Sequence, residues 1–258
     1  FLRRGIGVDL AYYFLSSLLP ASLLSVPTAL LAWVAHNLVP GGILATAAAL
    51  PTWARVLAAI VLGDLGYYWG HRWSHQIPFL WKFHAIHHSA EEIDFLVNTR
   101  AHPVDMVFGR FCSLTPIYVL GLGGPTGAAG SLAPVLATLV STMWGFFVHA
   151  NVRWRFGPLE WLVATPAFHH WHHTRNGPIN RNYAAALPWI DWLFGTRHLP
   201  GDWPEAYGIK AKLPDSLIGQ LAYPLRDRPS AAPLPQAPAH GGGPSTIESP
   251  MLTPGEFA

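Results

Sequence analysis

Histidine recurs at helical spacings in two stretches, and this recurrence constrains the fold more than any other feature of the chain. Residues 71–88 read HRWSHQIPFLWKFHAIHH, and residues 169–173 read HHWHH. Side chains three or four residues apart on a helix share one face, and neutral imidazole is a good ligand for zinc, copper, iron and nickel. One metal ion needs fewer ligands than these stretches offer, so the pattern predicts two ions in a shared cage. The predicted ligands are His71, His75, His84, His87, His88, His169, His172 and His173.

A solvent-exposed histidine tract is the simpler interpretation of such a pattern. Tracts of that kind usually lack aromatic residues, whereas Trp73, Trp81, Phe83 and Trp171 are interleaved with these histidines. Aromatic side chains bury large apolar areas in protein interiors. We therefore expect the histidines to lie in a packed region of the protein.

The composition favours an integral-membrane protein. Hydrophobic residues make up 51% of the 258 residues and charged residues only 12%, whereas a soluble domain carries about 25% charged residues. A span needs about 20 predominantly apolar residues. The expected fold class is all-α: an integral-membrane helical bundle of about four spans with a cytoplasmic histidine-rich cap of short helices. The expected spans are residues 6–38 (kinked or broken by Pro20 and Pro27), 51–70, 103–122 and 129–150.

The positive charges predict the orientation of this bundle. The loops between spans one and two and between spans three and four have no Lys or Arg. Cytoplasmic loops carry an excess of these residues, so both termini and all the histidine clusters are expected on the cytoplasmic side. Residues 151–198 are expected to form short interfacial helices that close over the metal site. The charges lie at Arg3, Arg4, Arg72, Lys82, Arg100, Arg153 and Arg155.

Two parts of the chain differ in composition. Residues 1–199 are interpreted as the membrane domain, with a motif-bearing core at 60–196. Residues 200–258 are rich in Pro and Gly and are predicted to be disordered, because they cannot bury enough apolar surface to offset the entropy of ordering. The net charge of +2 and the lack of a basic run argue against a nucleic-acid partner.

Two further residues stand out near the clusters. His149, at the expected end of span four, can converge on the same cap as a ninth ligand. His71 and His75 are expected just past the end of span two. Asp64 lies inside that span, where an ionisable residue is a functional candidate. Two roles stay open for Asp64: a hydrogen bond to a histidine of another helix, or a bond that pins the helix to Tyr67, Tyr68 or a neighbouring backbone group.

Other histidines carry weaker expectations. His102 precedes span three, and both a direct ligand role and a role beside the metal or the substrate stay open, with the second favoured. His170 points off the face shared by His169, His172 and His173, so a structural role is expected for it.

These motifs resemble those of the fatty acid hydroxylase and sterol desaturase superfamily of integral-membrane diiron enzymes. The signature is His-x-x-x-His or His-x-x-x-x-His followed by two copies of His-x-x-His-His. The similar segments, within residues 60–196, are DLGYYWGHRWSH, LWKFHAIHHSAEE, NTRAHP, HAN, TPAFHHWHH and NYAAALPWIDWLFGT.

The resemblance implies a four-span bundle with a cytoplasmic diiron centre. Such enzymes use O₂ and two electrons to hydroxylate or desaturate a lipid C–H bond, and zinc can replace iron in purified protein. The eight histidines above, with His149 as the ninth, are the implied ligands. The fatty acid 2-hydroxylase branch has a further histidine where this chain has Gly145. This departure favours the sterol-oxidase-like branches and leaves the coordination of one metal open.

Oxidation of a sterol-like or fatty-acyl lipid is the leading hypothesis for the function. A metal transporter is disfavoured, because transporters bind their ions near the bilayer midplane and these clusters gather at one face. A metal-binding membrane scaffold without oxygenase activity stays open, because ligands alone do not identify the metal. The chain has neither a Gly-x-Gly-x-x-Gly nor a His-Pro-Gly-Gly motif, so electrons are expected from a separate reductase, ferredoxin or cytochrome.

Overall fold

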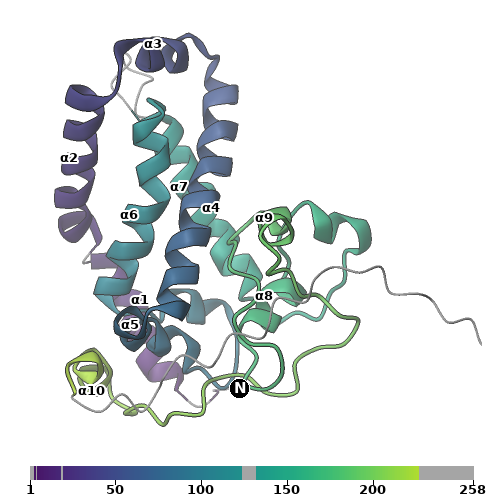
Figure 1. Cartoon of the computed structure of the whole chain (residues 1–258). Coiled ribbons are helices and arrows are strands. Elements are labelled where there is room, and N and C mark those ends of the chain that lie inside the picture. Colours follow the sequence, from purple (N-terminus) through teal and green to yellow (C-terminus); the bar gives the residue numbers. More distant parts are fainter. Residues whose placement is uncertain (1–2, 4, 19, 124–131, 227–258) are drawn as a thin grey trace, which may run out of the picture.

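The computed structural model describes residues 3, 5–18, 20–123 and 132–226, and the regular elements among them are helices. Helix α4 stands at the centre of a bundle and packs against α6 and α7, while α6 also packs against α2. Helix α3 crosses one end of this bundle (Figure 1). The prediction of an all-α fold is confirmed. The bounds are α2 Pro20–Leu38, α3 Gly41–Ala49, α4 Thr52–Gln76, α6 Pro103–Val119 and α7 Leu132–Val148.

The shorter elements gather at and beside the other end of the bundle (Figure 1). Pro78, Pro166 and Pro188 stand in the first turn of three of them. Proline suits this position, because the backbone N–H that it lacks would have no partner within the helix. These elements are α1 Ile6–Leu18, α5 Pro78–His88, η1 Phe95–Thr99, η3 Gly157–Trp161, α8 Pro166–His172, α9 Pro188–Leu193, α10 Leu217–Leu221 and η4 Tyr223–Leu225.

Glycines let α4 approach α6 closely. A Cβ atom at Gly66 would collide with the backbone carbonyl of Cys112, and one at Gly70 would lie 2.7 Å from the Cβ atom of Cys112. The absence of side chains at these two positions therefore sets the separation of the two helices. This packing brings the residues near the start of α6 next to the histidines at the end of α4.

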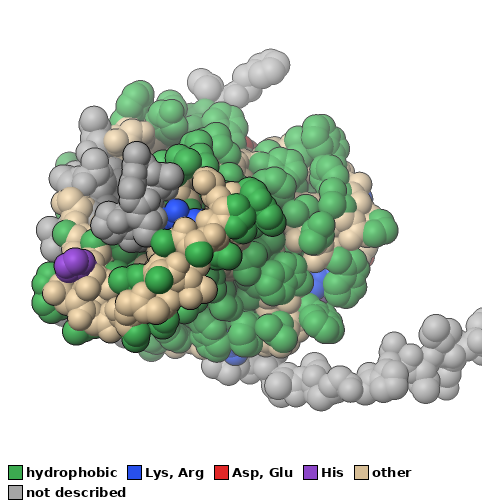
Figure 2. Space-filling view, turned by 90° about the horizontal axis from the view of Figure 1, so that it is seen from above, with side chains coloured by type: hydrophobic (Ala, Val, Ile, Leu, Met, Phe, Trp, Pro, Cys, Tyr) green, Lys and Arg blue, Asp and Glu red, His purple; other side chains and the backbone are tan. Residues whose placement is uncertain are grey.

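The membrane-span prediction is met only in part. Among the described residues, no single helix is long and apolar enough to cross a membrane. One pair of helical segments, Pro27–Leu38 and Gly41–Ala49, has the required length and hydropathy only when taken together, and the two are bent by 109° relative to each other. The face of the molecule at the α3 end nevertheless presents mostly hydrophobic side chains (Figure 2). The four spans and their orientation stay predictions.

Several helix boundaries differ from those expected. Helix α4 continues without a break to Gln76, so His71 and His75 lie within it and not beyond its end. No proline interrupts the chain between Pro51 and Pro78, which explains the continuation. The stretch assigned to an apolar loop after the first span contains α3. Of the expected fourth span, residues 129–131 lie outside the described residues.

The composition also misplaced the start of the tail. Residues 200–226 pack on the cap: Leu213 is buried in one cluster with Tyr12 and Ile86, and the Gln220 side chain is buried and donates to the Pro214 carbonyl oxygen. A few apolar side chains therefore suffice to order a proline-rich segment on an existing surface. The remainder of the predicted tail, 227–258, lies outside the described residues.

Candidate metal centre

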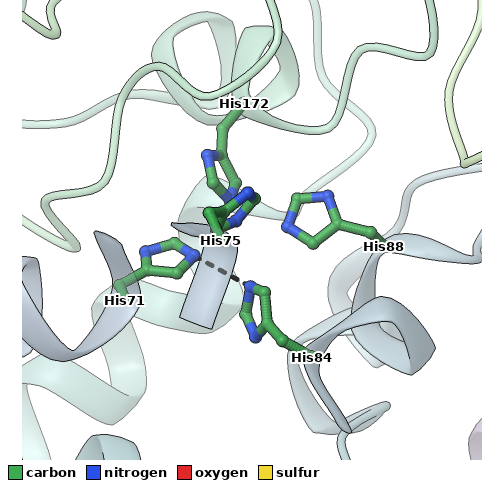
Figure 3. A group of neighbouring side chains, drawn as sticks. All are labelled: His71, His75, His84, His88 and His172. Atoms are coloured by element: carbon green, nitrogen blue, oxygen red, sulfur yellow. Dashed lines mark hydrogen bonds between the residues drawn. The ribbon is translucent and has the colours of Figure 1, made fainter. Parts of the chain in front are cut away.

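All nine predicted histidines are buried, and they form two adjacent groups. In the first group, one ring nitrogen of each member lies within 4.8 Å of those of the others. Its rings come from α4, α5 and α8 and converge on one another (Figure 3). The ring centroids of His71 and His172 are 4.4 Å apart, and those of His88 and His172 are 4.6 Å apart. The members are His71, His75, His84, His88 and His172.

The second group has four members that meet the same distance limit: His87, His149, His169 and His173. The Nε2 atom of His169 lies 2.9 Å from that of His149 and 3.1 Å from that of His173. The two groups touch, because the rings of His88 and His173 stack with centroids 4.5 Å apart.

Helix periodicity divides each His-x-x-His-His motif between the two groups. In α5, His84 and His88 are four residues apart and face the first group, while His87 faces the second. In the second motif the division is reversed, since His169 and His173 face the second group and His172 faces the first. Two ions held here would therefore share the same two helices, α5 and α8.

Hydrogen bonds fix which ring nitrogen faces inward for six of the nine histidines. A carbonyl oxygen can only accept, so each Nδ1 atom that meets one must carry the proton, and Nε2 then carries the lone pair. Such partners orient metal-binding histidines in general. The Nδ1 acceptors are the Tyr183 oxygen for His71 (2.7 Å), Asn180 Oδ1 for His75 (3.1 Å), Asp105 Oδ2 for His84 (3.0 Å), the Arg100 oxygen for His87 (3.3 Å), the Gly145 oxygen for His149 (2.7 Å) and the Arg181 oxygen for His172 (2.7 Å).

This arrangement leaves buried lone pairs without donors. The Nε2 atoms of His75 and His172 belong to the same group, are buried and have no hydrogen-bond partner in the part of the chain that the structure describes. A buried acceptor without a partner is costly, and a cation between these nitrogens would remove the cost. The donor set of neutral imidazoles suits iron or zinc. The residues present therefore fit a metal centre.

Burial keeps these rings in the neutral form that binds metals. Desolvation, followed by the neighbouring His84 imidazole, lowers the pKa of His87 to about 3. Desolvation and neighbouring imidazoles likewise hold the pKa values of His88, His169, His172 and His173 well below the usual range. At neutral pH no proton competes with a metal ion at these nitrogens.

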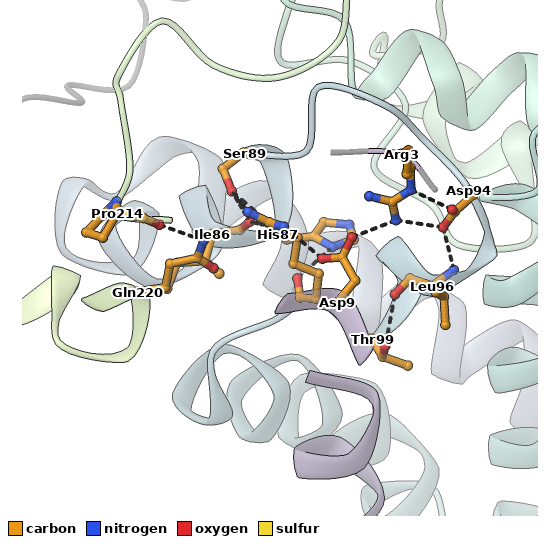
Figure 4. A network of polar contacts seen from close by, with 11 residues as sticks. Arg3, Asp9, Ile86, His87, Ser89, Asp94, Leu96, Thr99, Pro214 and Gln220 are labelled. Atoms are coloured by element: carbon orange, nitrogen blue, oxygen red, sulfur yellow. Dashed lines mark hydrogen bonds and ion pairs between the residues drawn. The ribbon is translucent and has the colours of Figure 1, made fainter. Parts of the chain in front are cut away.

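Two ionic contacts around the centre were not predicted from the sequence. Asp105, in the first turn of α6, accepts from His84 Nδ1. Arg100 bonds Asp9 Oδ1 at 2.7 Å, the Ile86 carbonyl oxygen at 3.2 Å and the Ser89 hydroxyl at 2.9 Å. Figure 4 shows this network, in which α1 is tied to α5 beside His87. Only the tertiary fold brings these partners together, since Asp9 and Arg100 are 91 residues apart.

The loop at residues 180–183 was also missed as part of the site. Asn180 and Asn182 adopt φ values of 63° and 59°, a left-handed conformation that asparagine tolerates better than most residues. The turn places the Asn180 side chain and the carbonyl oxygens of Arg181 and Tyr183 against three histidine rings of the first group. The asparagine-rich sequence NRNY was the available signal for this turn.

Of the two roles left open for Asp64, the structure favours a bond to backbone groups. No histidine among the described residues donates a hydrogen bond to it. Its Oδ1 accepts from the Ala185 amide at 2.7 Å, and its Oδ2 accepts from the Ala186 and Leu187 amides at 3.0 and 2.7 Å. The carboxylate thus pins the segment that follows Tyr183, whose carbonyl oxygen receives the His71 proton.

The two other histidines considered lie outside both groups. His102 caps α6, where its Nδ1 accepts from the Val104 amide, and its Nε2 donates to the Leu221 carbonyl oxygen. A direct ligand role for His102 therefore finds no support. His170 lies against Tyr207 and its Nδ1 contacts the Tyr207 hydroxyl at 2.9 Å, in keeping with the structural role expected for it.

A cavity of about 490 Å³ leads from the bundle to both histidine groups. Its wall includes members of the first group (His71, His84) and of the second (His87, His149, His169). Asn98 also lines it, and the Asn98 amide occupies the space that a side chain at Gly145 would need. The volume lies in the range of small-molecule sites, about 300–1,000 Å³.

Comparison with known proteins gives consistent matches. Residues 56–196 match the family model described as fatty acid hydroxylase. The chain is 34% identical over 177 residues to the ornithine lipid hydroxylase OlsE of Rhizobium tropici, which covers 66% of this chain and 50% of that protein. It is 29% identical to the alkylglycerol monooxygenase of Xenopus tropicalis (57% of this chain, 31% of that protein) and 28% identical to the methylsterol monooxygenase 2-2 of Arabidopsis thaliana (57% and 55%).

The chain thus spans about half or less of the length of the first two relatives. No solved structure matches it.

Proposed function

The chain belongs to the fatty acid hydroxylase family, and from this premise we propose that it oxidises a C–H bond of a membrane lipid with O₂, by hydroxylation or desaturation. The observation that carries the proposal is the pair of adjacent buried histidine groups at the wall of a ligand-sized cavity. The printed names of the relatives, an ornithine lipid hydroxylase, an alkylglycerol monooxygenase and a methylsterol monooxygenase, support a lipid substrate.

Each histidine group would hold one iron ion. His71, His75, His84, His88 and His172 would bind the first ion, and His87, His149, His169 and His173 the second. Iron held here would supply the activation of O₂, with one O₂, two electrons and two protons consumed for each hydroxylation (one water formed) or each desaturation (two waters formed). Zinc can occupy the same nitrogens in purified protein.

The protein's own groups orient and enclose this centre. Asp105 and the other oxygens at the Nδ1 atoms hold six of the nine imidazole rings in one tautomer, so their Nε2 lone pairs face inward before metal binds. The cavity gives a lipid carbon access to the histidine groups from the bundle. Because the histidines are buried, bulk water has little access to the reacting carbon.

Membrane insertion of the bundle is part of the proposal. Trp33, Trp53, Leu57, Leu139 and Met143 are each more than half exposed on the bundle helices. An apolar surface of this extent marks contact with lipid or with another protein. The Arg and Lys distribution supports a cytoplasmic cap, and a separate reductase, ferredoxin or cytochrome would deliver electrons there.

The test is lipid analysis of cells that express the chain. Lipid extracts of cells with the wild-type chain are compared with those of cells with His172→Ala, under ¹⁸O₂. The proposal expects a lipid species with one added oxygen atom from ¹⁸O₂, or one that has lost two hydrogens, in wild-type cells alone. A lipid profile that is identical in the two strains, with both proteins present in the membrane, would contradict the proposal.

A further inference from the structure

Arg110 is a cation in the middle of α6, a helix that is otherwise mostly apolar (PVDMVFGRFCSLTPIYV). It lines the cavity together with Met106 and Ser113, which share its face of the helix, and with the adjacent Gly109. The ring of Tyr67 packs on α6 at Gly109, beside it. Arg110 therefore faces the space that we assign to the substrate and does not face the outer surface of the bundle.

Among the described residues, no side chain or backbone oxygen pairs with the Arg110 guanidinium. The two carboxylates of the surrounding cavity wall are already engaged, since Asp64 accepts three backbone amides and Asp105 accepts from His84. Arg110 is half-buried, and a charged group partly removed from water is stabilised by a partner of opposite charge. An anionic ligand in the cavity would supply the negative charge that the described wall does not offer.

We propose that Arg110 binds the anionic group, a carboxylate or a phosphate, of an amphiphilic substrate, and so determines which lipids enter the cavity. The planar guanidinium matches both oxyanions through two parallel hydrogen bonds. Ser113 on α6 and Ser141 on α7 line the same cavity and can add hydroxyl donors. An ionisable residue within an apolar helix commonly marks a substrate pathway.

The position of Arg110 also limits where oxidation can occur. Arg110 follows Asp105, the partner of His84, by five residues, which places it about 7.5 Å further along the helix axis. An anion held there lies deeper in the bundle than the histidines. The oxidised carbon is therefore a few bonds from the anionic group and not at the far end of a long chain.

The test measures binding, without O₂ or an electron donor. Equilibrium dialysis gives the Kd values of hexadecanoate, hexadecyl phosphate and hexadecanol for the purified chain in detergent micelles. Arg110→Gln should raise the Kd of the preferred anion at least about tenfold and change that of hexadecanol less than about twofold. Arg110→Lys keeps the positive charge but loses the planar guanidinium with its two parallel donors. Its Kd for the anion should lie between those of wild type and Arg110→Gln. The anion that the wild-type chain prefers distinguishes a carboxylate from a phosphate.

The matched control is Arg153→Gln, which removes one positive charge from an exposed position outside the cavity and should change none of these Kd values. If Arg110→Gln raised the Kd of the anion and that of hexadecanol by the same factor, the inference would be overturned. A wild-type chain that binds neither anion more tightly than hexadecanol would also overturn it. The wild-type comparison decides the question even if Arg110→Gln fails to fold. The inference rests on the proposed function. Anion binding without any lipid oxidation would nevertheless refute only the proposed function and not the role of Arg110.

Discussion

Replacing Asp64 with asparagine tests how the centre is held in place. The two side chains have nearly the same shape, but the amide group carries one acceptor oxygen instead of two. Asp64 accepts from three backbone amides, two of them at Oδ2. The least costly arrangement of the asparagine side chain would keep its oxygen at the Oδ2 position and turn its NH₂ group toward the Ala185 amide. One buried amide then loses its acceptor and faces another donor.

The cost can be worked out from these contacts. A buried donor left without a partner costs about 1–3 kcal/mol, and a hydrogen bond to a charged group exceeds a neutral one by about 1 kcal/mol. With one bond lost and two weakened, the free energy of unfolding should fall by about 3–5 kcal/mol. That is a large part of the roughly 5–15 kcal/mol that stabilises a typical domain. Because the pinned segment adjoins Tyr183, the metal affinity should also fall.

Denaturant unfolding in detergent and the metal content of the purified protein measure the two effects. Asp215→Asn is the matched control, since Asp215 is exposed, and it should change the free energy of unfolding by less than about 0.5 kcal/mol. If Asp64→Asn and Asp215→Asn behaved alike, the three backbone contacts would not stabilise the fold, and this reasoning would be refuted.

Three other outcomes are expected. Asp105→Asn removes the negative charge beside His84 and should weaken metal binding about tenfold to a hundredfold, as measured by metal retention against a chelator. His172→Ala should abolish lipid oxidation, whereas His170→Ala should be milder, because His170 contacts Tyr207 outside both groups; equal losses in the two variants would count against the assignment. A chain that ends at residue 212 should unfold at a lower temperature than one that ends at 226, because residues 213–226 include buried Leu213 and Gln220; equal melting temperatures would show that this segment adds no stability.

The histidine spacing was enough to predict which residues lie together in the two groups, because periodicity places members of a motif on related helix faces. Which histidines of one motif join which histidines of the other could not be predicted, since this depends on how α8 packs relative to α5. The partners of Asp64 lie more than 120 residues away in the sequence, and no local pattern indicates them. For the same reason the role of Asp105 became visible only once α6 was placed beside α5.

The bundle and the cap show a similar contrast. Long apolar stretches predicted α4, α6 and α7 approximately, and α4 in particular runs without a proline between Pro51 and Pro78. Composition did not predict that residues 200–226 pack on the cap, because an average over a proline-rich segment does not reveal the few side chains that become buried. Leu213 illustrates this, since its burial depends on a surface formed by Tyr12 and Ile86.

The central claim is that the nine histidines hold two metal ions, and metal content per chain tests it most directly. Protein from iron-supplemented cells is analysed for wild type, for His75→Ala, which belongs to the first group alone, and for His149→Ala, which belongs to the second alone. The account predicts about two ions per wild-type chain and about one in each variant, in keeping with two-metal sites in general. One ion or fewer in active wild-type protein, or two ions retained in His149→Ala, would contradict it.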